Sequence, residues 1–156
     1  MNEEVPKEKL DRILNNYTLA STGLGLIPVP AADIAGLMAV QLSMLKEIAD
    51  LYKVPFLKEA VKKVLTSLIG GFFLTNTMPF LASTLKFVPV LGQTIGMATM
   101  PAACGASTYA TGKVFIRHFE SGGTFLTFAP EKVKQYYAEM LKQGKKQAAK
   151  LKDREN

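Results

Sequence analysis

Apolar residues recur at helical spacing along most of the chain. Behind Pro6, four of them follow the i, i+3, i+4, i+7 spacing that places side chains on one face of a helix: Leu10, Ile13, Leu14 and Tyr17. Six more follow Pro55 in a similar stripe: Leu57, Ala60, Val61, Val64, Leu65 and Leu68. A proline is tolerated in the first turn because its missing N–H has no partner there. The pattern therefore predicts helices that begin near Pro6 and Pro55.

The same reasoning predicts further helices over residues 30–52, 72–86 and 93–119, and a last amphipathic, basic helix from Pro130. Proline and glycine predict breaks near residues 23–30, 53–55, 70–71, 87–92 and 120–129. No strand pattern is convincing, although residues 124–128 could form an extended link. We therefore predict an all-α fold, a compact bundle of five to six helices.

Two segments resemble each other at an offset of 61 residues. Residues 27–34 and 88–95 share an aliphatic-Pro-Val start and an isoleucine six residues after the first proline, and each leads into an apolar helix. Two related helical hairpins would explain this similarity. Chance combined with ordinary helix-start chemistry would explain it equally well.

Charged residues are strongly segregated along the chain. Between Ile13 and Leu45 the only charged residue is Asp33, and between Val64 and Gly112 it is Lys86. The uncharged runs 64–85 and 87–112 both exceed the roughly 20 residues that span a bilayer. Their prolines, amides and hydroxyls argue against ideal transmembrane helices. A shallow hairpin, a conditional insertion and a dry oligomeric core all fit this region.

The net charge of +6 comes mostly from the end of the chain. Residues 130–156 hold 8 Lys and Arg against 4 Asp and Glu, whereas residues 1–63 hold 8 against 8. A basic end of this kind remains solvated or binds an anionic membrane surface. Nucleic acid is the least favoured partner, and we expect none.

Length indicates one domain over residues 1–156, with a core at about 6–141 and a basic tail at about 142–156. Apolar residues make up 48% of the chain and charged residues 21%, which excludes a disordered chain. The start Met1-Asn2-Glu3-Glu4 lacks the basic residues and apolar run of a signal peptide. We expect a location in the cytoplasm or on the cytoplasmic side of the cell membrane.

Asp33 and Lys86 are the candidate buried polar residues. Asp33 follows Pro30 by three residues, where a carboxylate meets the positive end of the helix dipole. Alternatively, Asp33 faces a cavity or partner inside an apolar layer, and burial then raises its pKa. A contact between Asp33 and Lys86 is a third alternative.

No catalytic, cofactor or metal site is predicted. His118 has no second ligand at metal-binding spacing, so we expect a solvated histidine at a helix end. Cys104 lies among small residues, which favours a buried, inert thiol and excludes an internal disulfide. The glycines near residues 23–25 and 105–112 depart from nucleotide-binding spacing. We therefore expect no enzyme.

Small residues recur along the predicted helix 93–119 and just before it. They are Gly92, Gly96, Ala98, Ala102, Ala106 and Ala110. A narrow face of this kind lets two helix backbones approach closely, in a membrane or in a tightly packed soluble bundle. We therefore predict a helix-packing or membrane-facing role for these six residues.

Several motifs together resemble one known family. They are Ile27-Pro28-Val29-Pro30, Asp33-Ile34, residues 41–45 and 49–52, Val88-Pro89-Val90-Leu91-Gly92, residues 105–110, and residues 115–125. Over about residues 10–140 the chain resembles the domain of unknown function 697 family. One departure is Lys53, where the family pattern leads us to expect glycine.

The resemblance implies a helical, hydrophobic module that follows a GTPase domain in some bacterial proteins and stands alone in others. This chain resembles the stand-alone form. Our first hypothesis is a non-enzymatic, membrane-associated module that uses the 64–112 region and acts with a separate GTPase. The alternative is a soluble protein that buries its apolar centre in a homo-oligomer. A third is a carrier that binds a hydrophobic ligand.

Overall fold

The computed structural model describes residues 4–24, 30–76 and 89–155, with the side chains of residues 30–34 and 71–100 outside the description. Five α-helices and one short 3-10 helix form the described part: α1 (Lys7–Leu24), α2 (Pro30–Tyr52), α3 (Lys58–Asn76), α5 (Pro89–Glu120), η1 (Pro130–Val133) and α6 (Lys134–Glu155). No described residue belongs to a strand. The predicted all-α fold is confirmed.

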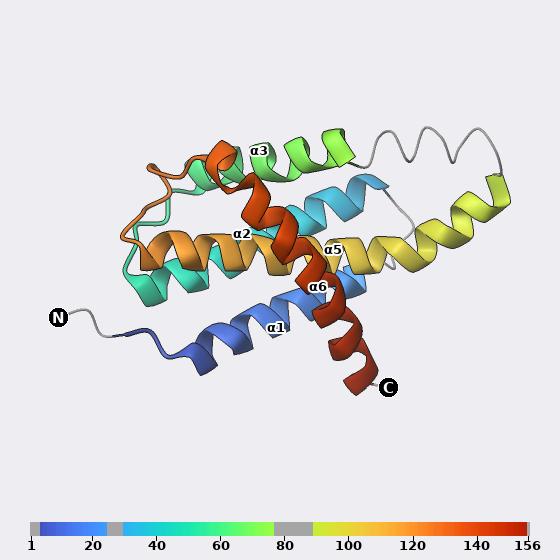
Figure 1. The fold of residues 1–156 in the computed structure, drawn as a ribbon, viewed down its shortest axis with the longest axis horizontal. Coiled ribbons are helices and arrows are strands. Elements are labelled where there is room, and N and C mark those ends of the chain that lie inside the picture. The colour runs from blue at the N-terminus through green and yellow to red at the C-terminus, as the bar shows by residue number, and fades with distance from the viewer. Residues whose placement is uncertain (1–3, 25–29, 77–88, 156) are drawn as a thin grey trace.

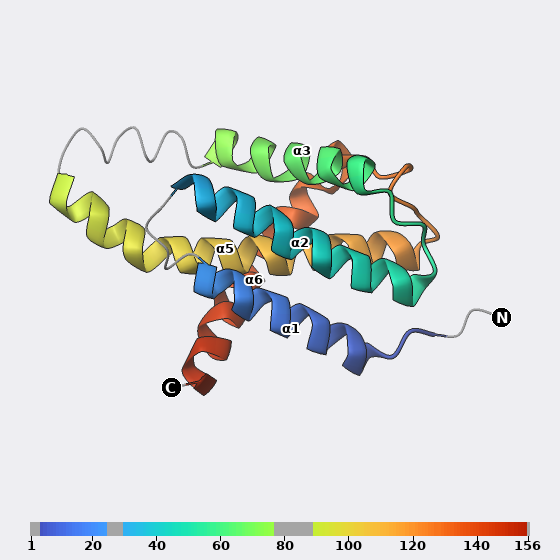
Figure 2. The same cartoon turned by 180° about the vertical axis from the view of Figure 1, so that it is seen from behind.

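The helices form a bundle around α5 (Figure 1). α1 and α3 lie along opposite edges, and α2 runs between them in the reverse direction. The view from behind shows that α2 covers one side of α5, whereas α6 crosses α5 on the other side (Figure 2). α5 therefore contacts α1, α2 and α6, while α3 packs on α2 and η1.

Proline starts and glycine-type ends delimit the helices. α2 and α5 begin at Pro30 and Pro89. After α5, the N–H of Gly123 bonds the carbonyl of His118 at 2.9 Å, and Gly122 takes φ 85°, where glycine has no Cβ penalty. Lys53 ends α2 in the same left-handed conformation, at φ 57°. The missing glycine at Lys53 therefore does not prevent this helix ending.

Three details of the predicted helices are wrong. Gly70 lies inside α3, which continues to Asn76, so the predicted break at 70–71 is absent. A helix-interior glycine costs only about 1 kcal/mol, which neighbouring apolar residues offset. Residues 89–92 belong to α5 and do not form a break. Residues 125–127 form a turn, so 124–128 is no extended link. The predicted helix 72–86 overlaps α3 up to Asn76, and its remainder lies outside the described residues.

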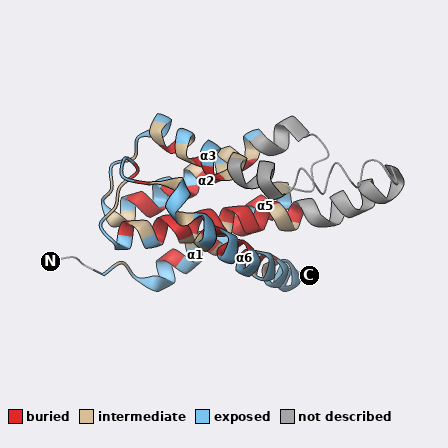
Figure 3. Cartoon of the chain, turned by 45° about the horizontal axis from the view of Figure 1, so that its top comes forward, coloured by how far each residue is buried: buried red, intermediate tan, exposed pale blue. Residues whose placement is uncertain are grey.

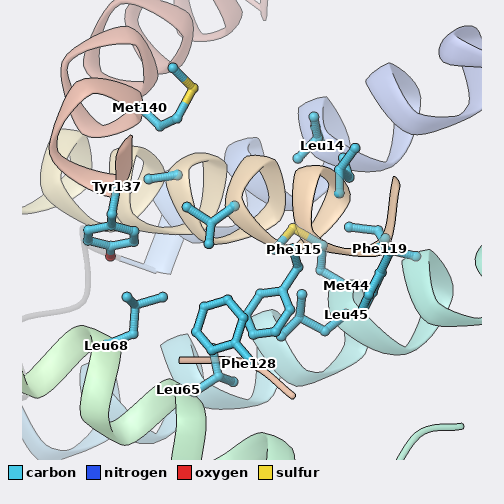
Figure 4. Close-up of a cluster of buried hydrophobic side chains, with 14 of the residues drawn as sticks. Leu14, Met44, Leu45, Leu65, Leu68, Phe115, Phe119, Phe128, Tyr137 and Met140 are labelled. Atoms are coloured by element: carbon cyan, nitrogen blue, oxygen red, sulfur yellow. The ribbon is translucent and has the colours of Figure 1, made fainter. Parts of the chain in front are cut away.

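The core lies where α5 meets its neighbours (Figure 3). Phe115 is fully buried, and its ring stacks on Phe128 with centroids 4.4 Å apart. Next to this aromatic pair lie Met44 and Leu45 of α2 and Leu65 of α3 (Figure 4). These apolar contacts hold the C-terminal half of α5 in a fixed position.

Candidate functional site

The C-terminal half of α5 is the most enclosed segment of the described chain. From Cys104 to Ile116, every residue except Tyr109 and Lys113 is buried. α1, α2 and α6 all pack on this segment. Any property of the protein that depends on how these helices fit together therefore depends on α5.

Polar side chains form a buried layer inside this apolar contact. The Gln41 amide donates to Ser107 Oγ at 3.1 Å and to Thr108 Oγ1 at 3.2 Å. The Thr111 hydroxyl donates to Gln41 Oε1 at 3.2 Å, and Ser21 Oγ lies 2.6 Å from Thr108 Oγ1. We call Ser21, Gln41, Ser107, Thr108 and Thr111 the polar layer. It joins α1, α2 and α5 by hydrogen bonds.

Tyr137 extends the polar layer to α6. Its hydroxyl lies 3.2 Å from Ser107 Oγ, and the residue is 2% exposed. Burial raises the pKa of Tyr137, while hydrogen bonds with Ser107 and Thr111 act in the opposite direction. The phenol therefore remains protonated at neutral pH. The polar layer and Tyr137 together connect α1, α2, α5 and α6 by hydrogen bonds.

The polar layer has the chemistry of a structural network. Its members are neutral hydroxyls and one amide, which cannot ionise at neutral pH to act as a general acid or base. Within the described residues, no three His, Cys, Asp or Glu side chains gather as metal ligands would. Buried polar groups that satisfy one another restrict helices to one relative position.

Glycines permit the close helix contacts around the polar layer. A Cβ on Gly144 of α6 would lie 2.8 Å from the Cα of Ala106, so the two backbones almost touch. A Cβ on Gly105 would overlap Thr22 of α1 and lie 3.0 Å from Ala148 of α6. Gly105 and Gly144 therefore let α6 and α1 reach α5.

The sequence matches the family described as Domain of unknown function (DUF697) over residues 2–146. The chain belongs to this family. It is 34% identical over 145 residues to magnetosome membrane protein 22 of Magnetospirillum gryphiswaldense. The matched region covers 92% of this chain and 74% of that protein. No solved structure matches the chain significantly. In the described part of this DUF697 chain, no helix combines the length and apolar character needed to cross a membrane.

Half of the predicted small-residue face can be placed by its side chains. Ala106 and Ala110 are fully buried, and Ala102 is half-buried. Gly92, Gly96 and Ala98 belong to α5, but their surroundings lie outside the described residues. The shared packing role of all six residues stays a prediction.

Asp33 and Lys86 also stay predictions. Asp33 belongs to α2, three residues after its first residue Pro30, and its side chain lies outside the described part. Lys86 lies wholly outside the described residues. Their proposed contact is therefore untested.

His118 is not the solvated histidine that the sequence predicted. Its ring is half-buried, meets Phe128 edge-on at 5.1 Å, and places Nε2 2.8 Å from the Thr124 carbonyl oxygen and 3.3 Å from Thr127 Oγ1. A Cβ on Gly123 would overlap the ring. The helix end alone did not reveal this role, because the loop after Gly122 folds back onto the imidazole. Cys104 is buried, as predicted.

The polar layer was not predicted from the sequence. Gln41 stands at i+4 from Leu37 and i−3 from Met44, so it shares the buried face of α2. Thr108 and Thr111 share a face of α5 in the same way, three residues apart. A polar residue at a core position of an apolar helix was the available signal.

Proposed function

We propose that this DUF697 protein is a non-enzymatic helical module that associates with a membrane from its cytoplasmic side. The observation that carries the proposal is its relative: a magnetosome membrane protein resembles 92% of the chain at 34% identity. The similarity spans 145 residues, so the proposal concerns most of the chain. The finer part of the proposal is that the 64–112 region provides the apolar contact.

The course of α5 supports this choice of region. Its C-terminal half is enclosed by α1, α2 and α6, whereas its first turns extend beyond the ends of α2 and α3 in both views (Figures 1 and 2). α5 also bends in its N-terminal half, which contains Pro101. Proline lacks the backbone N–H that donates in a regular helix. The projecting arm belongs to the segment that has Lys86 as its single charge.

The surface of α6 supports an anionic membrane as the target. Its seven basic residues are all exposed: Lys134, Lys142, Lys145, Lys146, Lys150, Lys152 and Arg154. The same helix carries three acidic residues, Glu139, Asp153 and Glu155, so basic residues are in excess. Each lysine or arginine near an anionic surface contributes about 1 kcal/mol to binding. In this proposal α6 lies against headgroups, and a separate GTPase acts with the module.

Fractionation of the native protein, followed by a carbonate wash of the membranes, tests the proposal. We expect the protein in the membrane fraction, with wash-resistant material if the 64–112 region enters the bilayer. Recovery in the soluble fraction as a homo-oligomer, measured by analytical ultracentrifugation, would overturn membrane association and favour burial of the apolar centre between copies. Co-purification of a hydrophobic small molecule with the soluble monomer would instead identify the protein as a carrier of a hydrophobic ligand.

A further inference from the structure

A surface groove lies between the first half of α1, the last turns of α5 and the start of α6. Its cavity volume is about 600 Å³. Leu10, Leu14 and Ile116 form its apolar floor, each at most 8% exposed. We call this depression the basic groove because of the three cations on its rim, Lys7, Lys113 and Arg117.

Two of these cations are held by aromatic rings. The Arg117 guanidinium carbon lies 4.4 Å from the centre of the Tyr136 ring, and Lys113 Nζ lies 5.6 Å from that of Tyr109. They occupy successive turns of α5, so both side chains emerge on one side of the helix. A guanidinium stacked on a ring keeps the N–H donors in its plane available to an acceptor.

No carboxylate of the described residues lies within ion-pair distance of these cations. Within the described ranges, the ion pairs shorter than 4.0 Å are Lys46–Asp50 and Lys62–Glu59, and neither involves the basic groove. Glu120 also lines the groove, but its Oε1 accepts a hydrogen bond from Tyr52 of α2 at 3.3 Å. Lys113 and Arg117 are therefore positioned cations without an acidic partner at contact distance.

The net charge of the residues that line the groove would balance one negative charge on a ligand. Lys7, Lys113 and Arg117 contribute +3 and Asp11 and Glu120 contribute −2, which leaves +1. A phosphodiester carries a single negative charge at neutral pH, whereas a nucleoside triphosphate carries several. The carboxylates of Asp11 and Glu120 can accept hydrogen bonds from headgroup hydroxyls or an ammonium group. An apolar floor under a rim of this kind suits an amphiphile.

We propose that the basic groove binds the phosphodiester headgroup of a membrane phospholipid, with Arg117 and Lys113 contacting the phosphate oxygens. The apolar part of the lipid next to the phosphate lies over Leu10, Leu14 and Ile116. This inference rests on the proposed membrane association and adds a defined lipid site to it. Arginine favours phosphate because its planar donors match two oxygens at once.

Vesicle flotation of the full chain separates the groove from general charge attraction. We expect Lys113→Gln/Arg117→Gln to lower partitioning onto phosphatidylglycerol–phosphatidylcholine vesicles roughly tenfold or more. The matched control is Lys58→Gln/Lys63→Gln, which removes the same charge from exposed positions on α3, at the opposite edge of the bundle from α1. We expect the control to change partitioning by less than about twofold, since distant exposed charges are screened.

Equal losses in the two double variants would overturn the groove and leave membrane association standing. Unfolding temperatures of both variants show whether either loss reflects a failure to fold. Wild-type protein that does not float with any vesicle would overturn the proposed function. A titration with a short-chain, water-soluble phosphatidylglycerol then judges the groove by itself.

Nuclear magnetic resonance reports that titration at the groove. We expect resonances of Ile116 and Tyr136 to shift with the short-chain lipid and to shift far less with inorganic phosphate, which cannot use the apolar floor. No shift with the lipid would overturn the site. An equal response to inorganic phosphate would also overturn it, because the groove would then be a site for a free anion.

Discussion

Gln41 shows how one polar residue can determine the position of a helix. It is fully buried in α2, and its amide uses both its nitrogen and its oxygen on three hydroxyls of α5. An apolar residue at this position would pack against α5 in several alignments. An amide whose bonds must be satisfied accepts far fewer, because an unsatisfied buried group costs about 1–3 kcal/mol.

Replacement of Gln41 by alanine should therefore destabilise the protein strongly. We expect the free energy of unfolding to fall by about 2–5 kcal/mol, from the cavity together with the loss of the hydrogen bonds that Gln41 makes to Ser107, Thr108 and Thr111. Urea denaturation measures this loss. Gln135→Ala, at an exposed position of α6, should change stability by less than about 0.5 kcal/mol. Similar losses in both variants would show that the polar layer contributes little.

At the scale of the element, the crossing of α5 and α6 depends on the absence of side-chain volume. Gly144 and Ala106 bring the two backbones together. On one side of this contact, Tyr137 forms a hydrogen bond with Ser107 of the polar layer. Gln147 of α6 also donates to Asn15 of α1 at 2.9 Å. α6 is therefore positioned by contacts with two helices, and its basic surface has a defined orientation on the bundle.

Two glycine-to-alanine variants should change stability in opposite directions. Gly144→Ala places a methyl group against the backbone of Ala106, and we expect a loss of about 1–3 kcal/mol. Gly70→Ala lies inside α3 with nothing within 4 Å of the new methyl group, so helix propensity should add about 0.5–1 kcal/mol. Thermal melts followed by circular dichroism compare the two.

Enlarging the other side of this contact provides a second measurement. Ala106→Leu should destabilise the fold by at least as much as Gly144→Ala, whereas a leucine at exposed Lys134 should be nearly silent. A stable Ala106→Leu variant would refute close packing of α5 and α6.

At the scale of the whole molecule, two tyrosine–glutamate hydrogen bonds join helices across the surface. Tyr17 of α1 donates to Glu47 of α2 at 2.5 Å, and Tyr52 of α2 donates to Glu120 of α5. Desolvation, followed by the neighbouring carboxylate, raises the pKa of each tyrosine to about 12. Both bonds require a protonated phenol, so they respond to alkaline pH.

Stability should decline between about pH 10 and pH 12. A folded-state pKa above the ordinary value of 10.0 means that the folded protein retains the phenol proton longer than the unfolded chain. The resulting stabilisation is complete below pH 10 and is lost as pH rises through the folded pKa. Unfolding temperatures measured across this range should fall less steeply for Tyr17→Phe/Tyr52→Phe, since phenylalanine cannot ionise. Identical slopes would contradict the assignment.

Most of the helical segments can be predicted from the sequence alone. Pro30 starts a helix, Gly122 follows the end of another, and apolar stripes such as that of Leu10 and Leu14 fall on buried faces. These features depend on residues within a few positions of one another, so they can be read along the chain. The break predicted at Gly70 failed because contacts of the surrounding helix outweigh a local propensity of about 1 kcal/mol.

The contacts between distant polar and small residues depend on how the helices pack and could not be predicted from the sequence. Thr111 and Gln41 are 70 positions apart, and Gly144 reaches Ala106 only because α6 crosses α5 at that point. The basic groove likewise combines Lys7 of α1 with Arg117 of α5 and Tyr136 of α6. Such partners depend on the angles and alignment of packed helices, which arise from the sum of many long-range contacts and which local spacing does not encode.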